Sequence, residues 1–248
     1  MNVWFYSMVS VTIVSMLSLM GVFALVLQGD KLHRITLFLV SFAVGGLLGD
    51  AFIHLIPESL VQHGSTLAVS LYILAGVLGF FLLEKYVLWR HFHVQAEDRK
   101  VDAVVPMILL GDSVHNFIDG AVIGASYLVN IPLGVTTTLA VVLHELPHEI
   151  GDFGVLVHGG LSVRRALLLN FLTALTAIAG TVVSLAVGPY LQGYTETIVP
   201  LTAGGFIYIA CADLIPELQD EVSPWRSLLQ LLCILGGIGI MVLLVLMG

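Results

Sequence analysis

Two short segments of the chain gather the side chains that bind transition metals. In the first, four polar residues recur at the i, i+3, i+4, i+7 spacing of one helix face: Asp112, His115, Asn116 and Asp119. In the second, five residues form an equally narrow stripe: His144, Glu145, His148, Glu149 and Asp152. If the two helices face each other, imidazole, amide and carboxylate groups converge on one point. That mixture suits Zn²⁺ and its first-row neighbours, and it is too rich in nitrogen for a Mg²⁺ or Ca²⁺ cage.

The elements that carry these stripes belong to a chain far too apolar for an ordinary soluble domain. Of its 248 residues 58% are hydrophobic and 10% are charged, and the mean hydropathy is +1.03, whereas soluble domains are about a quarter charged. Eight apolar stretches are long enough to span a bilayer: 3–27, 35–59, 67–89, 103–127, 133–157, 166–187, 198–217 and 228–247. Lipid cannot satisfy backbone polar groups, and the stretches do not alternate in polarity as barrel strands do. We therefore expect an all-α membrane protein with a single transmembrane domain over 1–248.

The basic residues predict which way the helices run. All nine lie in or beside the loops after the first, third, fifth and seventh stretches: Lys31, Arg34, Lys85, Arg90, Arg99, Lys100, Arg164, Arg165 and Arg226. The positive-inside rule places these loops in the cytoplasm and both termini outside. The net charge of −8 argues against nucleic acid as a partner. Compact loops without a targeting segment indicate a plasma or inner membrane.

The longest of the basic loops, at 90–102, carries His91 and His93. Two neutral imidazoles one residue apart are suited to catching a metal ion. A solvated connector is the simpler interpretation, and the sequence leaves the role of both histidines open.

An internal repeat relates two of the stretches. Residues 44–58 align without gaps to 203–217 at an offset of 159, with seven of 15 positions identical, including LIPE. The copies lie in stretches that cross in opposite directions, so we expect an inverted 3+2+3 repeat, which is typical of secondary transporters. A duplicated helix-proline stop used for packing would explain the glycines and prolines. It does not explain the metal-ligand types His54 and Asp213 at the same place in both copies.

Besides Glu84, which lies near a boundary, the apolar stretches contain nine carboxylates: Asp50, Glu58, Asp112, Asp119, Glu145, Glu149, Asp152, Asp213 and Glu217. Each ionised carboxylate at mid-membrane costs about 2.5–3.5 kcal/mol on insertion scales. Apart from Lys85, at the cytoplasmic end of the third stretch, no lysine or arginine lies within the stretches to offset that cost, so bound metal, protons or water must do so. Asp50, His54, Asp213 and Glu217 are candidate transient ligands at the mouths of a path. For His54 alone an interhelical hydrogen bond is the simpler interpretation, and Asn170 either packs between helices or completes a ligand shell.

Two other functions fit parts of the pattern. HELPH at 144–148 satisfies HExxH, in which two histidines bind Zn²⁺ and the glutamate is the general base of a protease. Proline inside that motif is unfavourable because both histidines must lie on one undistorted helix, and HNFID and the repeat would then have no role. A proton-coupled transporter of a non-metal substrate would use the acids only as a relay.

The longer segments around the two stripes resemble the ZIP (Zrt/Irt-like) family of divalent-metal transporters. HNFIDG at 115–120 and HELPHEIGDF at 144–153 are similar to its fourth- and fifth-helix signatures, especially in the subfamily with an HExPHE motif. GD-x-x-x-H-x-x-P in the second stretch and DLIPE in the seventh extend the resemblance over the whole chain.

The resemblance implies a homodimeric transporter, not an enzyme, that moves Zn²⁺ into the cytoplasm without an organic cofactor. Cd²⁺, Fe²⁺ and Mn²⁺ fit the same ligands. It also implies a two-metal centre. One site would use His115, Asp119, His144 and His148, and the other Asn116, Asp119, Glu145 and His148. Other members add a glutamate from the sixth helix, and this sequence has no acid there. An elevator-like shift of the first, fourth, fifth and sixth helices against the rest is implied as well.

Overall fold

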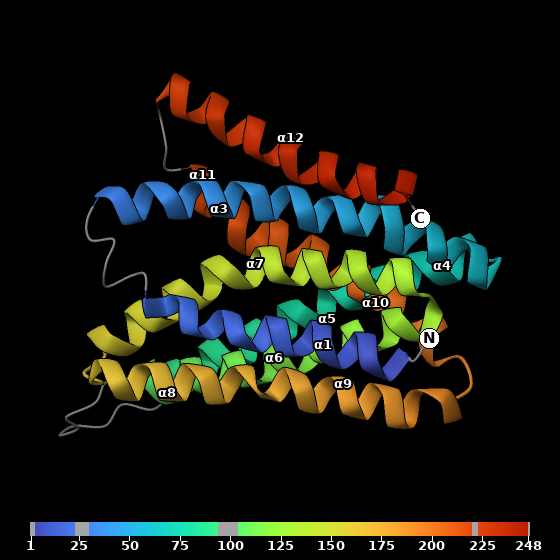
Figure 1. Cartoon of the computed structure of the whole chain (residues 1–248), viewed down its shortest axis with the longest axis horizontal. Coiled ribbons are helices and arrows are strands. Elements are labelled where there is room, and N and C mark those ends of the chain that lie inside the picture. Colours follow the sequence, from blue (N-terminus) through green and yellow to red (C-terminus); the bar gives the residue numbers. More distant parts are fainter. Residues whose placement is uncertain (1–2, 23–29, 94–103, 220–222, 248) are drawn as a thin grey trace.

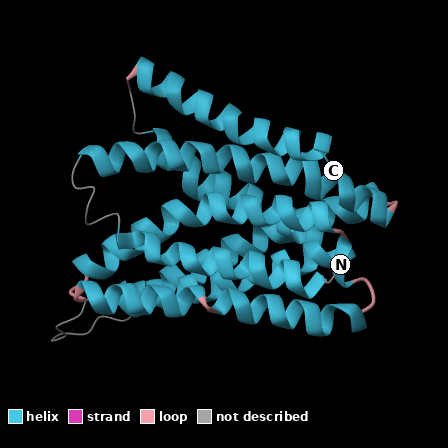
Figure 2. Cartoon of the chain, viewed as in Figure 1, coloured by secondary structure: helices cyan, strands magenta, loops and turns pink. Residues whose placement is uncertain are grey.

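The structure, a computed structural model, describes residues 3–22, 30–93, 104–219 and 223–247, and these residues form helices joined by short turns without any strand (Figure 2). The first half comprises α1 (Val3–Leu17), a 3₁₀ turn η1 (Ser18–Val22), α3 (Asp30–Gly49), a π-helix η2 (Asp50–Leu55), α4 (Ile56–His63), α5 (Thr66–His93) and α6 (Val104–Val129). The second half comprises α7 (Ile131–His158), α8 (Val163–Ala174), α9 (Thr176–Val187), η3 (Gly188–Tyr190), α10 (Tyr194–Tyr208), a π-helix η4 (Ile209–Leu214), α11 (Ile215–Gln219) and α12 (Pro224–Met247).

Six helical segments are long and apolar enough to cross a membrane, and they run along the long axis of the molecule (Figure 1). They cover 3–20, 37–63, 66–85, 163–190, 194–219 and 224–246. The expected all-α membrane architecture is confirmed at this level. The other two long helices, α6 and α7, have 26 and 28 residues and are therefore long enough to span. Their acids and histidines lower their hydropathy, because these two helices carry the polar stripes.

The two repeat copies share an unusual backbone feature. The π-helices η2 and η4 occupy equivalent positions, since Asp50–Leu55 shifted by 159 residues becomes Ile209–Leu214. In each copy a proline follows two residues later, Pro57 or Pro216. Proline has no backbone N–H and its ring crowds the carbonyl four residues earlier. A wider π turn ahead of it accommodates that loss, and such turns often mark functional sites.

Glycines allow α3 and α12 to cross with their backbones in contact. A Cβ on Gly45 would collide with the carbonyl oxygen of Ile234, and a Cβ on Gly237 would collide with the carbonyl oxygen of Phe42. Small residues serve this purpose in membrane bundles, where helices associate by close packing rather than by a hydrophobic driving force.

The crossing of α5 and α10 has the same construction. A Cβ on Gly204 would collide with the carbonyl oxygen of Ile73, and a Cβ on Gly76 would collide with that of Leu201. Gly204 and Leu201 lie 159 residues after the glycine and phenylalanine of the α3–α12 crossing. The two crossings therefore match residue for residue, and each joins a helix of the first half of the chain to one of the second.

The side chains on the outer faces of α5 and α12 are large and apolar. Exposed examples are Leu67, Leu71, Leu74 and Leu78 on α5, and Leu231, Leu235, Leu243 and Leu246 on α12. In water this surface would be an aggregation hazard, but in a bilayer it is the face that contacts lipid. The polar residues lie inside the bundle, where α6 and α7 pack against each other and against α1, α3, α9 and α10.

The glycine crossing predicts a difference between two neighbouring substitutions on α12. Gly237→Ala forces the α3 and α12 backbones apart and should destabilise the protein by about 1–3 kcal/mol, the usual cost of overpacking. Gly239→Ala is the matched control, because a Cβ there meets no atom within 4 Å among the described residues. Thermal unfolding of the purified proteins in detergent measures the difference. Equal melting temperatures for the two variants would refute the close crossing.

Candidate metal centre

One ligand from each of four residues meets between α6 and α7. The atoms come from His115 and Asp119 on α6 and from His144 and Glu145 on α7, and all lie within 4.8 Å of one another. His144 Nε2 lies 3.0 Å from an Asp119 oxygen, and His115 Nε2 lies 3.2 Å from a Glu145 oxygen. The sequence prediction that the two stripes face each other is therefore what this structure shows. At most 1% of the surface of Asp119, His144 and Glu145 is exposed.

The hydrogen bonding of His144 determines which ring nitrogen is available. Its Nδ1 lies 3.0 Å from the carbonyl oxygen of Ala140. A carbonyl oxygen only accepts, so Nδ1 carries the proton and donates it. In the neutral ring Nε2 then presents a lone pair to Asp119, and the two Nε2 atoms of His115 and His144 lie 3.3 Å apart. A backbone carbonyl behind the ring is the usual way to orient a metal-binding histidine.

A second ligand group lies beside the first and consists of carboxylates. Asp112 from α6 and Glu145 and Glu149 from α7 also bring one oxygen each within 4.8 Å of one another. Glu145 therefore belongs to both groups. Asn170 on α8 donates from Nδ2 to Glu149, and Asn116 donates from Nδ2 to Asp112 Oδ1 at 2.6 Å. These amides orient the carboxylates and leave their remaining lone pairs for another partner.

Several polar atoms around the two groups lack partners within the described ranges. The side-chain oxygen Oδ1 of Asn116, Oδ2 of Asp112 and Nε2 of His148 are buried and make no hydrogen bond there. Orphaned buried polar atoms are rare in proteins and require an explanation. All three are metal-ligand types and two of them can only accept, so a cation is a partner that would satisfy them.

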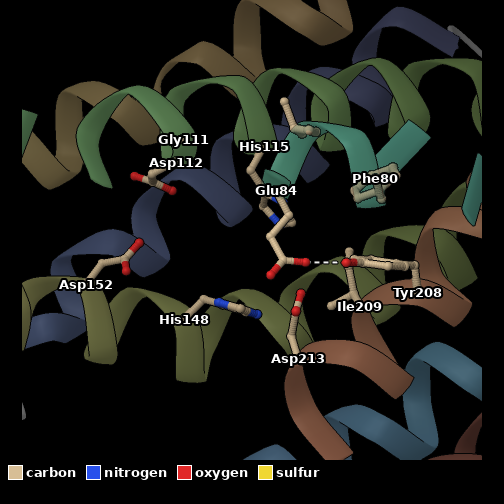
Figure 3. A pocket seen from close by; sticks show the side chains of 11 residues that line it. Phe80, Glu84, Gly111, Asp112, His115, His148, Asp152, Tyr208, Ile209 and Asp213 are labelled. Atoms are coloured by element: carbon tan, nitrogen blue, oxygen red, sulfur yellow. Dashed lines mark hydrogen bonds between the residues drawn. The ribbon is translucent and has the colours of Figure 1, made fainter. Parts of the chain in front are cut away.

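His148 lies next to the four-residue group without belonging to it. Its ring centroid is 5.8 Å from that of His115 and 6.1 Å from that of His144. Together with Asp152, His148 lines a cavity of about 190 Å³, which we call the Asp213 cavity (Figure 3). Asp213 of η4 also lines it. The bundle thus brings together the two stripes and one candidate from the repeat.

The remaining candidates lie elsewhere in the bundle. In the first π-helix, His54 Nδ1 lies 3.2 Å from an oxygen of Asp50, which is fully buried. His54 and Glu58 line a second cavity of about 470 Å³, which we call the His54 cavity. Asn130, which caps the start of α7, and Thr136 within α7 also line it. Glu217 on α11 is exposed and lines neither of the two cavities described here.

Two residues to which the sequence analysis assigned no role also line the Asp213 cavity. They are Glu84 of α5 and Tyr208 of α10, and the tyrosine hydroxyl donates a hydrogen bond to the carboxylate (Figure 3). The available signal was a carboxylate in an apolar stretch, but its position near the end of that stretch made it resemble an ordinary boundary residue. The metal-catching loop expected at 90–102 falls outside the described part of the chain, which leaves out residues 94–103 and the side chains of His91 and His93.

Comparison with known proteins identifies one family. The model of the ZIP Zinc transporter family matches residues 1–104 and 90–245 of the chain. Zinc transporter SLC39A7 of Homo sapiens is 32% identical over 335 residues, covering 98% of this chain and 71% of the relative. Zinc transporter ZIP13 of Pongo abelii is 38% identical over 220 residues, covering 83% of this chain and 65% of the relative. Zinc transporter zipt-7.1 of Caenorhabditis briggsae is 34% identical and covers 82% of this chain and 69% of the relative.

The geometry predicts that His144 is required to bind the ion. His144→Ala removes a nitrogen that contacts Asp119 and should lower zinc affinity by at least about tenfold. His63→Ala is the matched control, because His63 is bonded to the backbone oxygen of Glu196, at the far end of α4. Metal analysis of purified, monodisperse protein after dialysis against limiting zinc makes the comparison. Retention of zinc by the His144 variant at the control level would show that the ion binds elsewhere.

Proposed function

The chain belongs to the ZIP zinc transporter family, and we propose that it binds its cargo, Zn²⁺, between α6 and α7 and releases it into the cytoplasm. It is a multi-pass membrane transporter of divalent metal ions and not an enzyme, so the protease and non-metal alternatives are set aside. The observation that carries the proposal is the four-residue group of His115, Asp119, His144 and Glu145, of which all but His115 are buried. The adjoining HELPHE segment at 144–149 favours the HExPHE branch of the family.

Electrostatics explain why this group needs a guest ion. In the described part of the chain, the ion pairs of the group join histidines to carboxylates only. A carboxylate in an apolar bundle is costly unless a positive charge accompanies it. A divalent cation supplies that charge and lets both histidines stay neutral, as metal ligation requires. The imidazoles favour Zn²⁺, and Cd²⁺, Fe²⁺ and Mn²⁺ remain candidates of the same chemistry.

We propose a two-ion centre in which Glu145 is the shared ligand. The nitrogen-containing group holds one ion, with His148 close enough to join after a small rearrangement. The carboxylate group of Asp112, Glu145 and Glu149 holds the other, with the oxygen of Asn116 beside it. Glu149, oriented by Asn170 of α8, supplies the carboxylate that other family members take from the sixth helix.

We propose that eight helices span the membrane as an inverted repeat with both termini outside. The matched π-helices and the two equivalent glycine crossings support the repeat. α6 and α7 are long enough to cross the membrane and lie within the bundle, which supports counting both among the eight spans. The His54 cavity and the Asp213 cavity would then be the outer and inner mouths of the path. Asp50, His54 and Asp213 are transient ligands there, and Glu217 lies nearer the inner surface.

The helices also fall into two packed groups, which supports the elevator motion. Hydrogen bonds of 2.8 Å join Ser10 of α1 to Tyr127 of α6, and Thr181 of α9 to the carbonyl of Gly120 of α6. The glycine crossings hold α3 against α12 and α5 against α10. We propose that one group, α1, α6, α7, α8 and α9, shifts as a unit against the other group, α3, α5, α10 and α12. A homodimer in a plasma or inner membrane is the assembly we expect.

Asp119→Ala should abolish transport. The substitution removes one carboxylate from the four-residue group, and a site with one ligand fewer holds the ion too weakly to carry it. Uptake of radioactive zinc into liposomes containing the purified protein measures this, and we expect a loss of at least about 100-fold, since loss of a mere hydrogen-bond partner of a metal ligand already costs about 10–100-fold. Glu196→Gln, near the N-terminus of α10, is the control acid. Wild-type uptake by the Asp119 variant would exclude this group as the transport site.

The shared ligand makes a separate prediction about stoichiometry. Glu149→Gln should reduce bound zinc at saturation from two ions to one, because only the carboxylate group loses a ligand. Glu145→Gln should weaken both ions, because both groups use it. Isothermal titration of apo-protein distinguishes the two variants. Two full-affinity ions in the Glu145 variant would contradict a shared ligand.

A further inference from the structure

The two mouth cavities occupy equivalent places in the repeat. His54 of the first cavity and Asp213 of the second are related by the offset of 159. The glycines at the two crossings relate α5 to α12 at an offset of 161, since Gly76 corresponds to Gly237. On that register Glu84 corresponds to Val245, and each of them lines its own cavity.

The equivalent positions carry different chemistry. Where the Asp213 cavity has Glu84, the His54 cavity has Val245, and where the former has Tyr208, the repeat position is Gly49. The hydrogen bond between Tyr208 and Glu84 therefore has no counterpart at these positions of the other copy. A duplicated packing element would not need a charged pair in one copy alone, so the pair calls for a role of its own.

Tyr208 determines where the carboxylate of Glu84 lies. Its hydroxyl donates a hydrogen bond to Glu84 Oε2, which ties α10 to α5. Its ring packs edge-on against Phe81, with the two ring centroids 6.5 Å apart. Figure 3 shows the carboxylate turned toward Asp213 and His148. The neighbouring Lys85 directs its ammonium over the Phe81 ring, 5.7 Å from the centroid.

The surroundings of Glu84 favour a cation. Asp213 brings a second carboxylate to the same cavity, and like charges held together in a partly apolar space repel each other unless a cation separates them. The buried Nε2 of His148 lines the same space and has no hydrogen-bond partner in the described residues. His148 also neighbours His115 of the metal centre, at 5.8 Å between ring centroids. A route of ligands thus runs from the buried centre through His148 to Glu84.

We propose that Glu84 is a ligand that accepts the ion as it leaves the metal centre, and that Tyr208 is a positioning residue that holds Glu84 toward His148. This inference rests on the proposed function of the α6–α7 centre. At this mouth the ion exchanges imidazole ligands for carboxylate ligands. Carboxylates are harder and better hydrated donors than imidazole, so they release the ion to water. At the other mouth, Val245 offers no ligand, and the ion is taken there by the imidazole of His54 instead.

Zinc uptake by liposomes containing the full chain tests the proposal through four variants: Glu84→Gln, Tyr208→Phe, the double variant and Glu84→Asp. Tyr208→Phe removes one hydrogen bond to a charged group and should lower the maximal rate about threefold to tenfold. We expect little change in the KM for zinc, because the defect lies after binding. Tyr190→Phe, on a side chain that is 87% exposed, is the control.

The double variant separates positioning from a structural role. If Tyr208 acts through Glu84, adding Tyr208→Phe to Glu84→Gln lowers the rate no further, and Glu84→Asp restores part of it. Multiplicative losses in the double variant, or wild-type rates in both single variants, would overturn the proposal. Zinc bound at equilibrium should stay at the wild-type level in every variant. Loss of bound zinc would mean that the substitutions damage the metal centre, which contradicts a role in release alone. Failure of the proposed function would instead appear as wild-type protein that takes up no zinc.

Discussion

The structure depends on one constraint: carboxylates and imidazoles converge in an apolar bundle, and among the described residues no lysine or arginine pairs with the group of His115, Asp119, His144 and Glu145. Asp119, Glu145 and His144 are almost completely buried, and their ion pairs are with each other and with His115. Such a group is unfavourable alone and favourable around a divalent ion, so ion binding and the packing of α6 on α7 are coupled. The same coupling makes a carrier possible, because the bundle orients each ligand while leaving lone pairs of the group for an ion.

The inverted repeat that we propose explains how such a site could open to either side. Matched glycine crossings join helices of the two halves, and matched π-helices carry His54 and Asp213 at equivalent positions, each beside one of the proposed mouths. The scaffold is therefore close to symmetric, while the side chains at the mouths are not. On the proposed path, imidazole chemistry at one mouth and the Glu84 carboxylate at the other would give a chemical direction that the backbone does not have.

Sequence reasoning predicted most of this arrangement, because helical periodicity and hydrophobicity act locally. The stripes containing His115 and His144 could be assigned to facing helices, since their spacing leaves few alternatives. The family resemblance placed Asp119 and His148 in both sites, whereas in the structure Glu145 belongs to both ligand groups. That difference could not be predicted, because Glu145 and Glu149 lie on the same stripe and only the packing of α8, with its Asn170, distinguishes their surroundings. Glu84 was missed for a related reason. Its importance comes from Tyr208, which is 124 residues away in the chain.

X-ray absorption at the zinc edge of loaded, purified protein tests the central claim most directly. We predict a first shell of imidazole nitrogen and carboxylate oxygen at about 2.0–2.1 Å from the zinc, together with the outer-shell scattering of at least two histidine rings. Loss of the histidine scattering in His144→Ala would confirm its source. A first shell of water oxygens alone, without imidazole, would contradict the claim that the ion binds between α6 and α7.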